Sequence, residues 1–318
     1  MAVSILLQSL GKAPGTWSNN DSHLRSFLKF CQQFSLTPWP ASPDTLVLYV
    51  SYLVTVKSLG VATVKNHLAS VRTFHSSHGF FIPSPKEHYP LSLALQGAAK
   101  FLSRPSQQKF PVTAPIMSRL LAACSMSSPI RSLYLLLFLT SLRLSSVIPS
   151  AHPFTFKAGA HLTWSDVLIK PEGVLVTIKK TKTIICLERT LSFFVPRHRS
   201  PSVCLLAHLL ALLSVPGYPS APLAPVFSVF VDRSWVPMTR LNVHYLFVRQ
   251  LTMMGLNPKL FGWASFRRGS ATEYLVATGD VEMLKLHGDW KSSIFRRYLA
   301  VPPERRSCVI STLQGLVA

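Results

Sequence analysis

Apolar residues in the first third of the chain recur at the three- and four-residue spacing of helices that bury one face. Prolines between Pro38 and Pro43 mark one break in this pattern, and Ser58–Gly60 marks another. Four helices are predicted. The first begins near Trp17–Asp21, the second begins at Asp44, and the third and fourth cover Thr63–His78 and Leu91–Phe101. The pattern therefore predicts an all-α unit over residues 1–101.

The periodic pattern stops at residues 102–115, which contain three prolines and are typical of a linker. Beyond them, helical periodicity returns at Ile116–Cys124, Ile130–Leu142, Ser202–Leu213, Thr239–Met254, Ser265–Thr278, Val281–Leu286 and Ser292–Leu299. Short strands are predicted at His161–Val167, Val174–Ile178 and Ile184–Leu191, the last two joined by a Lys-Thr-Lys-Thr turn. The expected fold class is two domains, with a mainly α second domain that carries a small β-sheet over residues 116–318.

The longest apolar runs, Leu133–Leu142 and Val203–Val215, are shorter than the ~20 residues that a membrane-spanning helix needs. We expect them to be buried core helices. The apolar residues Met1–Leu10 have no basic segment before them and no clean cleavage site, which argues against a signal peptide. The short apolar runs and the lack of a signal peptide therefore predict an intracellular protein without a membrane partner.

The five cysteines are odd in number, widely scattered and never in a C-x-x-C pair. This distribution argues against a disulfide framework and against a zinc site, and it suits a reducing compartment. We therefore expect no metal.

The formal net charge of +21 narrows the choice of partner. Residues 1–105 contain nine basic and three acidic side chains, which leaves 24 basic and nine acidic side chains for residues 106–318. Both parts are basic, and the charge is spread through helical segments rather than gathered in a tail. This distribution favours a protein that contacts nucleic acid along its whole length over a generic basic or membrane-associated protein.

Four short patterns in the second domain point to chemistry. They are Thr140–Ser145, the lysines of Lys179–Thr183, Ser265–Gly269, and Gly288–Ser292 followed by Tyr298. Taken singly, each has an ordinary structural explanation, such as a helix-end arginine or solvated hairpin lysines. However, Arg267 and Arg268 lie at a helix start, where the helix dipole disfavours positive charge, which hints at a nearby anion. An arginine that holds a phosphate beside a phenol that attacks it is the minimum equipment for covalent DNA cleavage.

Together and in this order, the patterns resemble the tyrosine recombinase (phage integrase) family, and most of all the DIRS and Crypton recombinases of eukaryotic mobile elements. The matching motifs are T-x-x-R-x-S, a K-T hairpin, S-F-R-R-G and G-x-W-x-S followed by tyrosine. The resemblance covers about residues 16–315. It implies a helical core-binding (SAM-like) domain over 1–101, a linker over 102–115 and a catalytic domain over 116–318.

The resemblance also implies roles. Arg143 and Arg267 would clamp the scissile phosphate, and Tyr298 would attack it to give a 3′-phosphotyrosine. Lys182 would protonate the leaving 5′ oxygen, with Lys179 or Lys180 in its place if the hairpin register differs. Trp290 would donate a hydrogen bond from its indole, with one residue of slack toward Asp289. Neither a metal nor a cofactor is needed.

Two positions depart from the family pattern. Ala264 stands where the family has a histidine, so general-base help worth ~10²–10⁴ in rate is missing. Ser146 stands where an acidic residue often supports the first arginine. His287 is a candidate substitute for the base, and Arg268 and Asp289 are further candidate contributors. A second hypothesis follows, in which the chain is a DNA-binding protein of the same fold with degraded catalysis.

The expected partner is double-stranded DNA, on which the family assembles as a synaptic tetramer. A eukaryotic mobile-element recombinase would act in the nucleus. The candidate DNA-binding residues are basic side chains between the apolar positions: Lys57, Lys65, Arg72, Lys100, Arg104, Lys179 and Lys180.

Overall fold

The computed structural model describes residue 11 and residues 14–102, 108–150, 152–181, 184, 188–290, 292–299 and 314. The chain divides into two compact units, residues 1–106 and 107–318. Each unit has its own hydrophobic core. No helix in the described part of the chain is long and apolar enough to cross a membrane.

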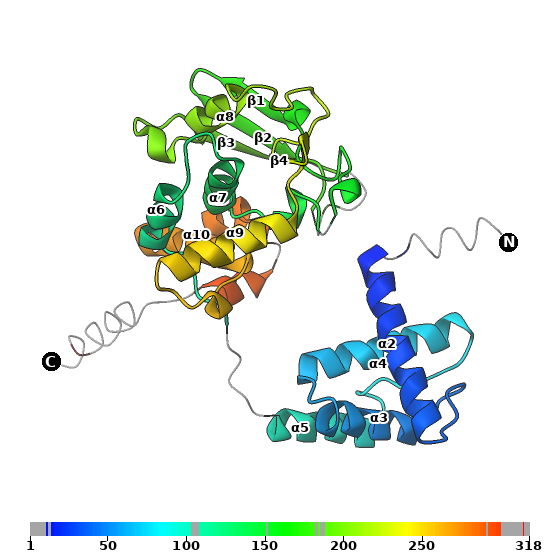
Figure 1. Ribbon diagram of the computed structural model, residues 1–318. Helices are drawn as coiled ribbons and strands as arrows, with labels where there is room; N and C mark the ends of the chain where they lie inside the picture. The colour runs from blue at the N-terminus through cyan, green and yellow to red at the C-terminus, as the bar shows by residue number, and fades with distance from the viewer. Residues whose placement is uncertain are drawn as a thin grey trace. The chain divides into compact units, whose positions relative to one another are not determined.

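The first unit is all-α, as predicted (Figure 1). Its helices are α2 (Pro14–Gln33), α3 (Pro43–Thr55), α4 (Val61–Ser77) and α5 (Tyr89–Phe101). Helix α3 begins where Ser42 caps it, since the Ser42 side chain accepts a hydrogen bond from the Thr45 amide at 3.1 Å. Helix α2 packs on α4 and α3 packs on α5, which buries the aromatic rings of Phe27 and Tyr49.

A buried polar network joins α2, α3 and α4. The rings of His23 and His67 lie 4.0 Å apart, and His67 Nδ1 is 2.9 Å from the Tyr49 hydroxyl. His23 Nδ1 in turn lies 2.8 Å from the hydroxyl of Ser70. Burial, together with the neighbouring His23, lowers the pKa of His67 to about 4. Burial also lowers the pKa of His23, so both rings are neutral at pH 7.

This network predicts an acid-sensitive first unit. The unfolded chain binds a proton at His67 below pH ~6.5, whereas the folded chain resists protonation down to a pKa of about 4. The first unit therefore has its full free energy of unfolding above pH ~6.5. This free energy falls by roughly 3 kcal/mol as the pH drops from ~6.5 to below the folded-state pKa of about 4. Urea unfolding followed by hydrogen exchange of α2 and α4 measures this. His67→Gln should flatten the pH dependence, and replacing the exposed His78 should not.

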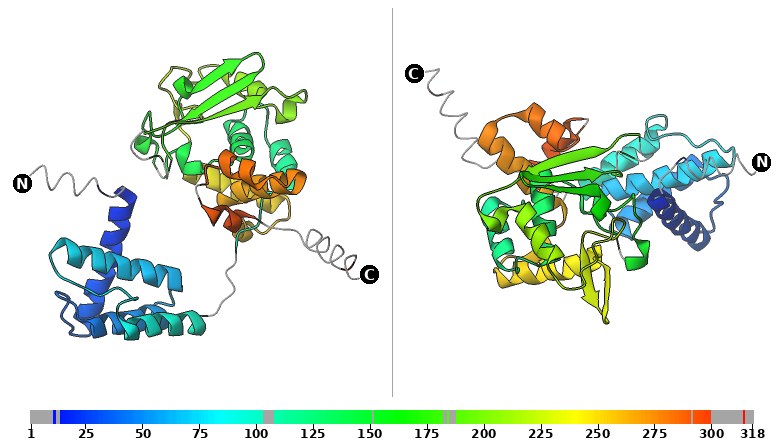
Figure 2. Two further views of the ribbon diagram at one scale, coloured as in Figure 1. Left: turned by 180° about the vertical axis from the view of Figure 1, so that it is seen from behind. Right: turned by 90° about the horizontal axis from the view of Figure 1, so that it is seen from above.

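The second unit is mainly α with two small antiparallel sheets (Figures 1 and 2). Its α-helices are α6 (Ala114–Ala122), α7 (Pro129–Thr140), α8 (Leu205–Leu213), α9 (Arg240–Met253), α10 (Ala264–Thr278) and α11 (Val281–His287). One sheet has the order β1-β2-β3 (Val167–Lys170, Gly173–Ile178, Leu191–Pro196), and the other pairs β4 (Ser228–Val231) with β5 (Ser234–Pro237). Single 3-10 turns include η1 (Leu144–Ser146), η3 (Trp164–Asp166) and η6 (Ser293–Tyr298).

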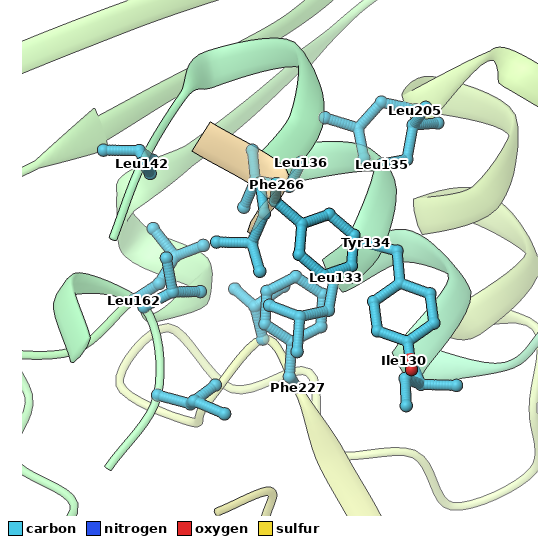
Figure 3. Packing of buried hydrophobic residues seen from close by; sticks show 14 of the residues in the cluster. Ile130, Leu133, Tyr134, Leu135, Leu136, Leu142, Leu162, Leu205, Phe227 and Phe266 are labelled. Carbon is cyan, nitrogen blue, oxygen red and sulfur yellow. The ribbon is translucent and has the colours of Figure 1, made fainter. Parts of the chain in front are cut away.

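The elements of the second unit pack in sequence from the three-stranded sheet to α10. Strand β2 contacts α8, α8 contacts α7, and α7 contacts α10. Figures 1 and 2 show the three-stranded sheet at one end of this unit and helices α9 and α10 at the other. Figure 3 shows the core beside α7, where the Phe266 ring of α10 lies by Tyr134 of α7, with ring centroids 5.2 Å apart. Helix α10 is thus fixed to α7 by its first turn.

The strands differ from the prediction at two boundaries. The first strand begins at Val167 and not at His161, because Thr163 and Asp166 close a capping box around the turn η3. The third strand begins at Leu191, where the expected run Ile184–Leu191 ends, because Leu191 is the residue that pairs with Ile178. The connection between β2 and β3 is therefore long and not a tight hairpin. Within the run Ser292–Leu299, residues Ser293–Tyr298 form a 3-10 helix rather than an α-helix.

Gly269 explains the glycine of the Ser265–Gly269 pattern. A Cβ atom at Gly269 would overlap the carbonyl group of Val112, whose amide donates to the Ser265 carbonyl at 2.9 Å. Helix α10 therefore approaches the backbone before α6 more closely than any side chain permits.

We expect Gly269→Ala to lower the free energy of unfolding by about 3 kcal/mol, since backbone must move to admit the methyl group. A thermal melt of the full chain measures this. Gly262→Ala is the matched control, because a Cβ atom there meets only the flexible Lys109 side chain at 3.8 Å. Equal melting temperatures for the two variants would contradict the prediction.

Candidate active site

Arg267 is the centre of the site. It follows Phe266, which is buried in the large core, and its own side chain is only 4% exposed. Its Nη1 donates to the Ser141 carbonyl at 2.5 Å, and its Nη2 donates to the Gly288 carbonyl at 2.6 Å. Ser141 ends α7 in the left-handed region, with φ of 52°. The guanidinium of Arg267 therefore bridges the end of α7 and the turn after α11.

Two aromatic rings face this guanidinium. The Arg267 Cζ atom lies 4.0 Å from the ring centroid of Trp290 and 5.3 Å from that of Tyr298. Trp290 and Tyr298 belong to a small hydrophobic cluster, separate from the large core, which α10, α11 and η6 enclose. Two donors here, Arg267 Nε and Trp290 Nε1, are buried and have no hydrogen-bond partner within the described ranges. Buried unpaired donors at one place suit an acceptor that the site binds.

Arg143 adds a second positive charge. It lies just after α7, with extended backbone before the turn η1, and its side chain is half-buried. Burial and the charge of Arg143 lower the pKa of Arg267 to about 10, while Tyr298 and Asp289 act in the opposite direction. Two arginines held this close repel one another, and an anion between them relieves that repulsion.

A pocket of about 220 Å³ joins these groups. It is lined by Leu142, Arg143, Leu144, Ser145, Arg240, Trp263, Ala264, Arg267 and Tyr298. The pocket therefore brings together three arginines and one phenol. Guanidinium groups bind phosphate oxygens, and a phenol is a nucleophile for phosphorus.

The sequence matches no protein-family model, and no curated protein is significantly similar to it. Solved structures do match. The chain is similar to the Tn1549 transposon integrase in complex with transposon right end DNA, with a TM-score of 0.62, 13% identity, and coverage of 99% of this chain and 98% of that one. It is also similar to a lambda integrase dimer bound to a core site (TM-score 0.56, 15% identity, coverage 93% and 92%). The XerH recombinase bound to its difH substrate matches at a TM-score of 0.51 and 14% identity, over 81% of this chain and 67% of that one.

The chain has the tyrosine recombinase fold. The expected fold class is thus confirmed. At sequence identities this low, the similarity to these structures establishes the fold alone.

Within this recombinase fold, the structure brings Arg143, Arg267, Trp290 and Tyr298 together, as the motifs predict. Arg240 was missed by the motif analysis. It is the first residue of α9, behind a capping box of Thr239 and Asn242, and it is exposed toward the same pocket. The signal was present, because an arginine at a helix start opposes the helix dipole, as Arg267 does.

The three hairpin lysines have different surroundings. Lys179 forms an ion pair with the buried carboxylate of Asp166. Lys180 is exposed. Burial is the main cause that lowers the pKa of His161, and the nearby charge of Lys180 lowers it further. Lys182 lies outside the described residues. The ion pair of Lys179 leaves it poorly suited to donate a proton to a substrate.

The two departures from the family pattern lie at the site itself. Ala264 begins α10 and is exposed in the pocket that also contains Tyr298. Ser146 is buried in the turn η1 behind Arg143. His287 does not line the Tyr298 pocket; it lines a narrow adjoining cleft with Arg143 and Arg267. Burial lowers the pKa of His287, and the charge of Arg267 adds to this, so the ring is neutral at pH 7.

Arg268 and Asp289 make protein contacts beside the pocket. Arg268 Nη1 donates to Gln108 Oε1 at 2.6 Å and to the Arg297 carbonyl at 2.9 Å, which ties α10 to η6. Asp289 accepts from Arg189, whose Nη2 is 2.8 Å from each carboxylate oxygen. Neither side chain lines the pocket of Tyr298.

The basic residues of the first unit lie on its surface. Lys57, Lys65 and Lys100 are exposed, and Arg72 is half-buried. Lys65 and Arg72 line a groove of about 640 Å³ between α4 and α5. Arg104 lies outside the described residues.

Proposed function

We propose that the chain cleaves and rejoins DNA at specific sites through a covalent 3′-phosphotyrosine on Tyr298. The observation that carries this proposal is the pocket in which Arg143, Arg267 and Tyr298 meet. The charge of Arg143 beside the buried Arg267 supports it, because a phosphate between the two guanidiniums would relieve their repulsion.

In this mechanism the scissile phosphate enters the pocket between Arg143 and Arg267. Both guanidiniums bind its non-bridging oxygens, and they stabilise the extra charge that develops on these oxygens in the pentacoordinate transition state. Trp290 donates its indole N–H to the same phosphate. The positive charge of two arginines thus replaces the metal ion that many phosphoryl-transfer enzymes use.

The Tyr298 oxygen attacks phosphorus, and the bond from phosphorus to the 5′ oxygen breaks. Lys182 supplies the proton that the leaving 5′ oxygen takes up. The products are a 3′-phosphotyrosine and a free 5′ hydroxyl. Because the new ester keeps the energy of the phosphodiester, attack by a 5′ hydroxyl rejoins the strand without a nucleotide cofactor.

The phenol proton has no protein acceptor at position 264, so it passes to solvent. Cleavage is therefore slow compared with an enzyme that has a histidine there, by ~10²–10⁴-fold. The neutral His287 does not replace this histidine, since it lies in the adjoining cleft.

The order of the four motifs supports a mobile-element origin of the DIRS or Crypton kind, and with it action in the nucleus. The Tn1549 transposon integrase among the similar structures is consistent with a mobile element. Recombination of two DNA sites requires four cleavages, so a synaptic tetramer on double-stranded DNA is the working assembly. The first unit, residues 1–101, and its basic residues contact the DNA backbone, and residues 116–318 carry the chemistry. The expected linker 102–115 is not a linker throughout, because Val112 is buried in the core of the second unit and Ala114 begins α6.

The test is a covalent adduct. The full chain is incubated with a pool of nicked duplexes that share a randomised central segment, and adducts are separated by denaturing electrophoresis. Cleavage near the nick releases a short fragment, which prevents rejoining and traps the adduct. Tyr298→Phe should abolish the adduct, whereas Tyr274→Phe, which removes a phenol packed on the same small cluster, should not.

The second candidate function is DNA binding by the same fold without cleavage, and Ala264 favours it. This function predicts no adduct from the wild-type chain, together with binding that weakens steeply as salt rises. Binding that is insensitive to salt would contradict both functions, because both require many phosphates to be neutralised.

A further inference from the structure

An ion pair beside the pocket joins two segments that are distant in the sequence. Arg189 lies just before β3, and Asp289 lies between α11 and η6. One guanidinium nitrogen of Arg189 is 2.8 Å from both carboxylate oxygens of Asp289. The Arg189 side chain is 35% exposed and that of Asp289 is 15% exposed. Partial burial on the Asp289 side makes this pair more than a solvated surface contact.

Asp289 occupies a demanding backbone position. Its φ of 51° lies in the left-handed region, which aspartate adopts more often than most residues with a side chain but still seldom. The residue before it, Gly288, gives its carbonyl to Arg267, and the residue after it, Trp290, places its ring 4.0 Å from the guanidinium of Arg267. The conformation of Asp289 thus sets two contacts of Arg267 at once.

We infer that Arg189 is a positioning residue, which holds the Gly288–Trp290 turn so that Arg267 keeps its place in the pocket. Asp289 acts with it and does not touch the substrate. The catalytic consequence rests on the proposed function, whereas the positioning itself does not. Without Arg189, Asp289 loses the ion pair that ties it to the segment before β3, and the turn relaxes away from the left-handed backbone.

Removing an ion pair that only adds to stability should not affect the site. The pair of Lys285 and Glu282 on the adjacent helix α11, 2.6 Å apart, is the matched comparison, because Glu282 is 78% exposed and does not line the pocket of Tyr298. Exposed pairs of this kind contribute little to stability. Its removal by Glu282→Gln should leave the site unchanged.

The first measurement follows the indole N–H resonance of Trp290 by NMR in the full chain, assigned with Trp290→Phe. Arg189→Ala and Asp289→Asn should both shift this resonance. Arg189→Lys keeps a positive charge for Asp289, so it should leave the resonance nearer the wild-type position than Arg189→Ala does, and Glu282→Gln should leave it in place. An unmoved resonance in Arg189→Ala, or an equal shift in Arg189→Lys, overturns the inference.

The second measurement compares adduct formation with DNA affinity. Arg189→Ala should lower the rate of adduct formation by about 10–10²-fold, as misplacement of a clamping group does, with an unchanged Kd for DNA. An unchanged rate, or a loss of rate that an increase in Kd explains, contradicts the catalytic consequence. A shifted resonance together with no adduct from wild type overturns the proposed function and leaves the positioning role standing.

Discussion

Replacing Arg267 with lysine should lower the rate of covalent adduct formation by about 10²–10³-fold, the usual effect of removing one preorganised donor from a developing oxyanion. A lysine has a single ammonium group and cannot bridge the carbonyls of Ser141 and Gly288 while it also binds a phosphate oxygen. Single-turnover kinetics on a duplex recovered from the randomised pool measures the rate.

Arg131→Lys is the control for this variant. Arg131 is also buried, at 7% exposure, and its terminal nitrogens donate to the carbonyls of Cys124 and Ser202. Its Nε, like that of Arg267, has no partner in the described part of the chain. Both variants should lose similar stability, but only Arg267→Lys should lose the chemical step. Equal loss of adduct in the two would mean that the effect comes from folding.

Ala264→His should raise the rate of adduct formation by ~10²–10⁴-fold, because it restores a base in the pocket that contains Tyr298. The gain should appear as the pH rises through about 6.5, where an ordinary imidazole loses its proton. Rates measured from pH 5 to 8, about one unit and more on each side of that value, test this.

Ala264→Asn separates the base from other effects of a larger polar side chain. It should leave the rate close to that of wild type and introduce no dependence on pH in this range. A histidine variant that is no faster than the asparagine variant would show that position 264 does not correspond to the base of the family.

Hydrophobic periodicity predicted most of the α-helices, since they bury one face. Helix α7 was predicted instead from its continuous apolar run, because it is buried on all sides. Periodicity failed where a local interaction outweighed the pattern, as when the Thr163 capping box delayed β1 to Val167. The hairpin β4–β5 was missed for another reason. Its two-residue turn, Asp232 and Arg233, has positive φ at both positions without a glycine, so the usual turn signal is absent.

The candidate site was also predicted from the sequence only in part. Arg143, Arg267, Trp290 and Tyr298 were found because their order along the chain matches a family, and the structure places them around one guanidinium. Pairings between distant residues were invisible to the sequence. Neither the ion pair of Lys179 with Asp166 nor that of Arg189 with Asp289 follows from local spacing.

The pocket is built on two separate hydrophobic cores. Leu142 and Leu144, on either side of Arg143, belong to the large core, whereas Tyr298 rests with Trp290 on the small cluster of α10, α11 and η6. A few apolar side chains stabilise the second support, so it opens at a lower free energy than the first. The Tyr298 phenol can therefore leave and re-enter the pocket by local unfolding of the small cluster, while Arg143 stays in place on the large core. The availability of the nucleophile is then set by the stability of the small cluster.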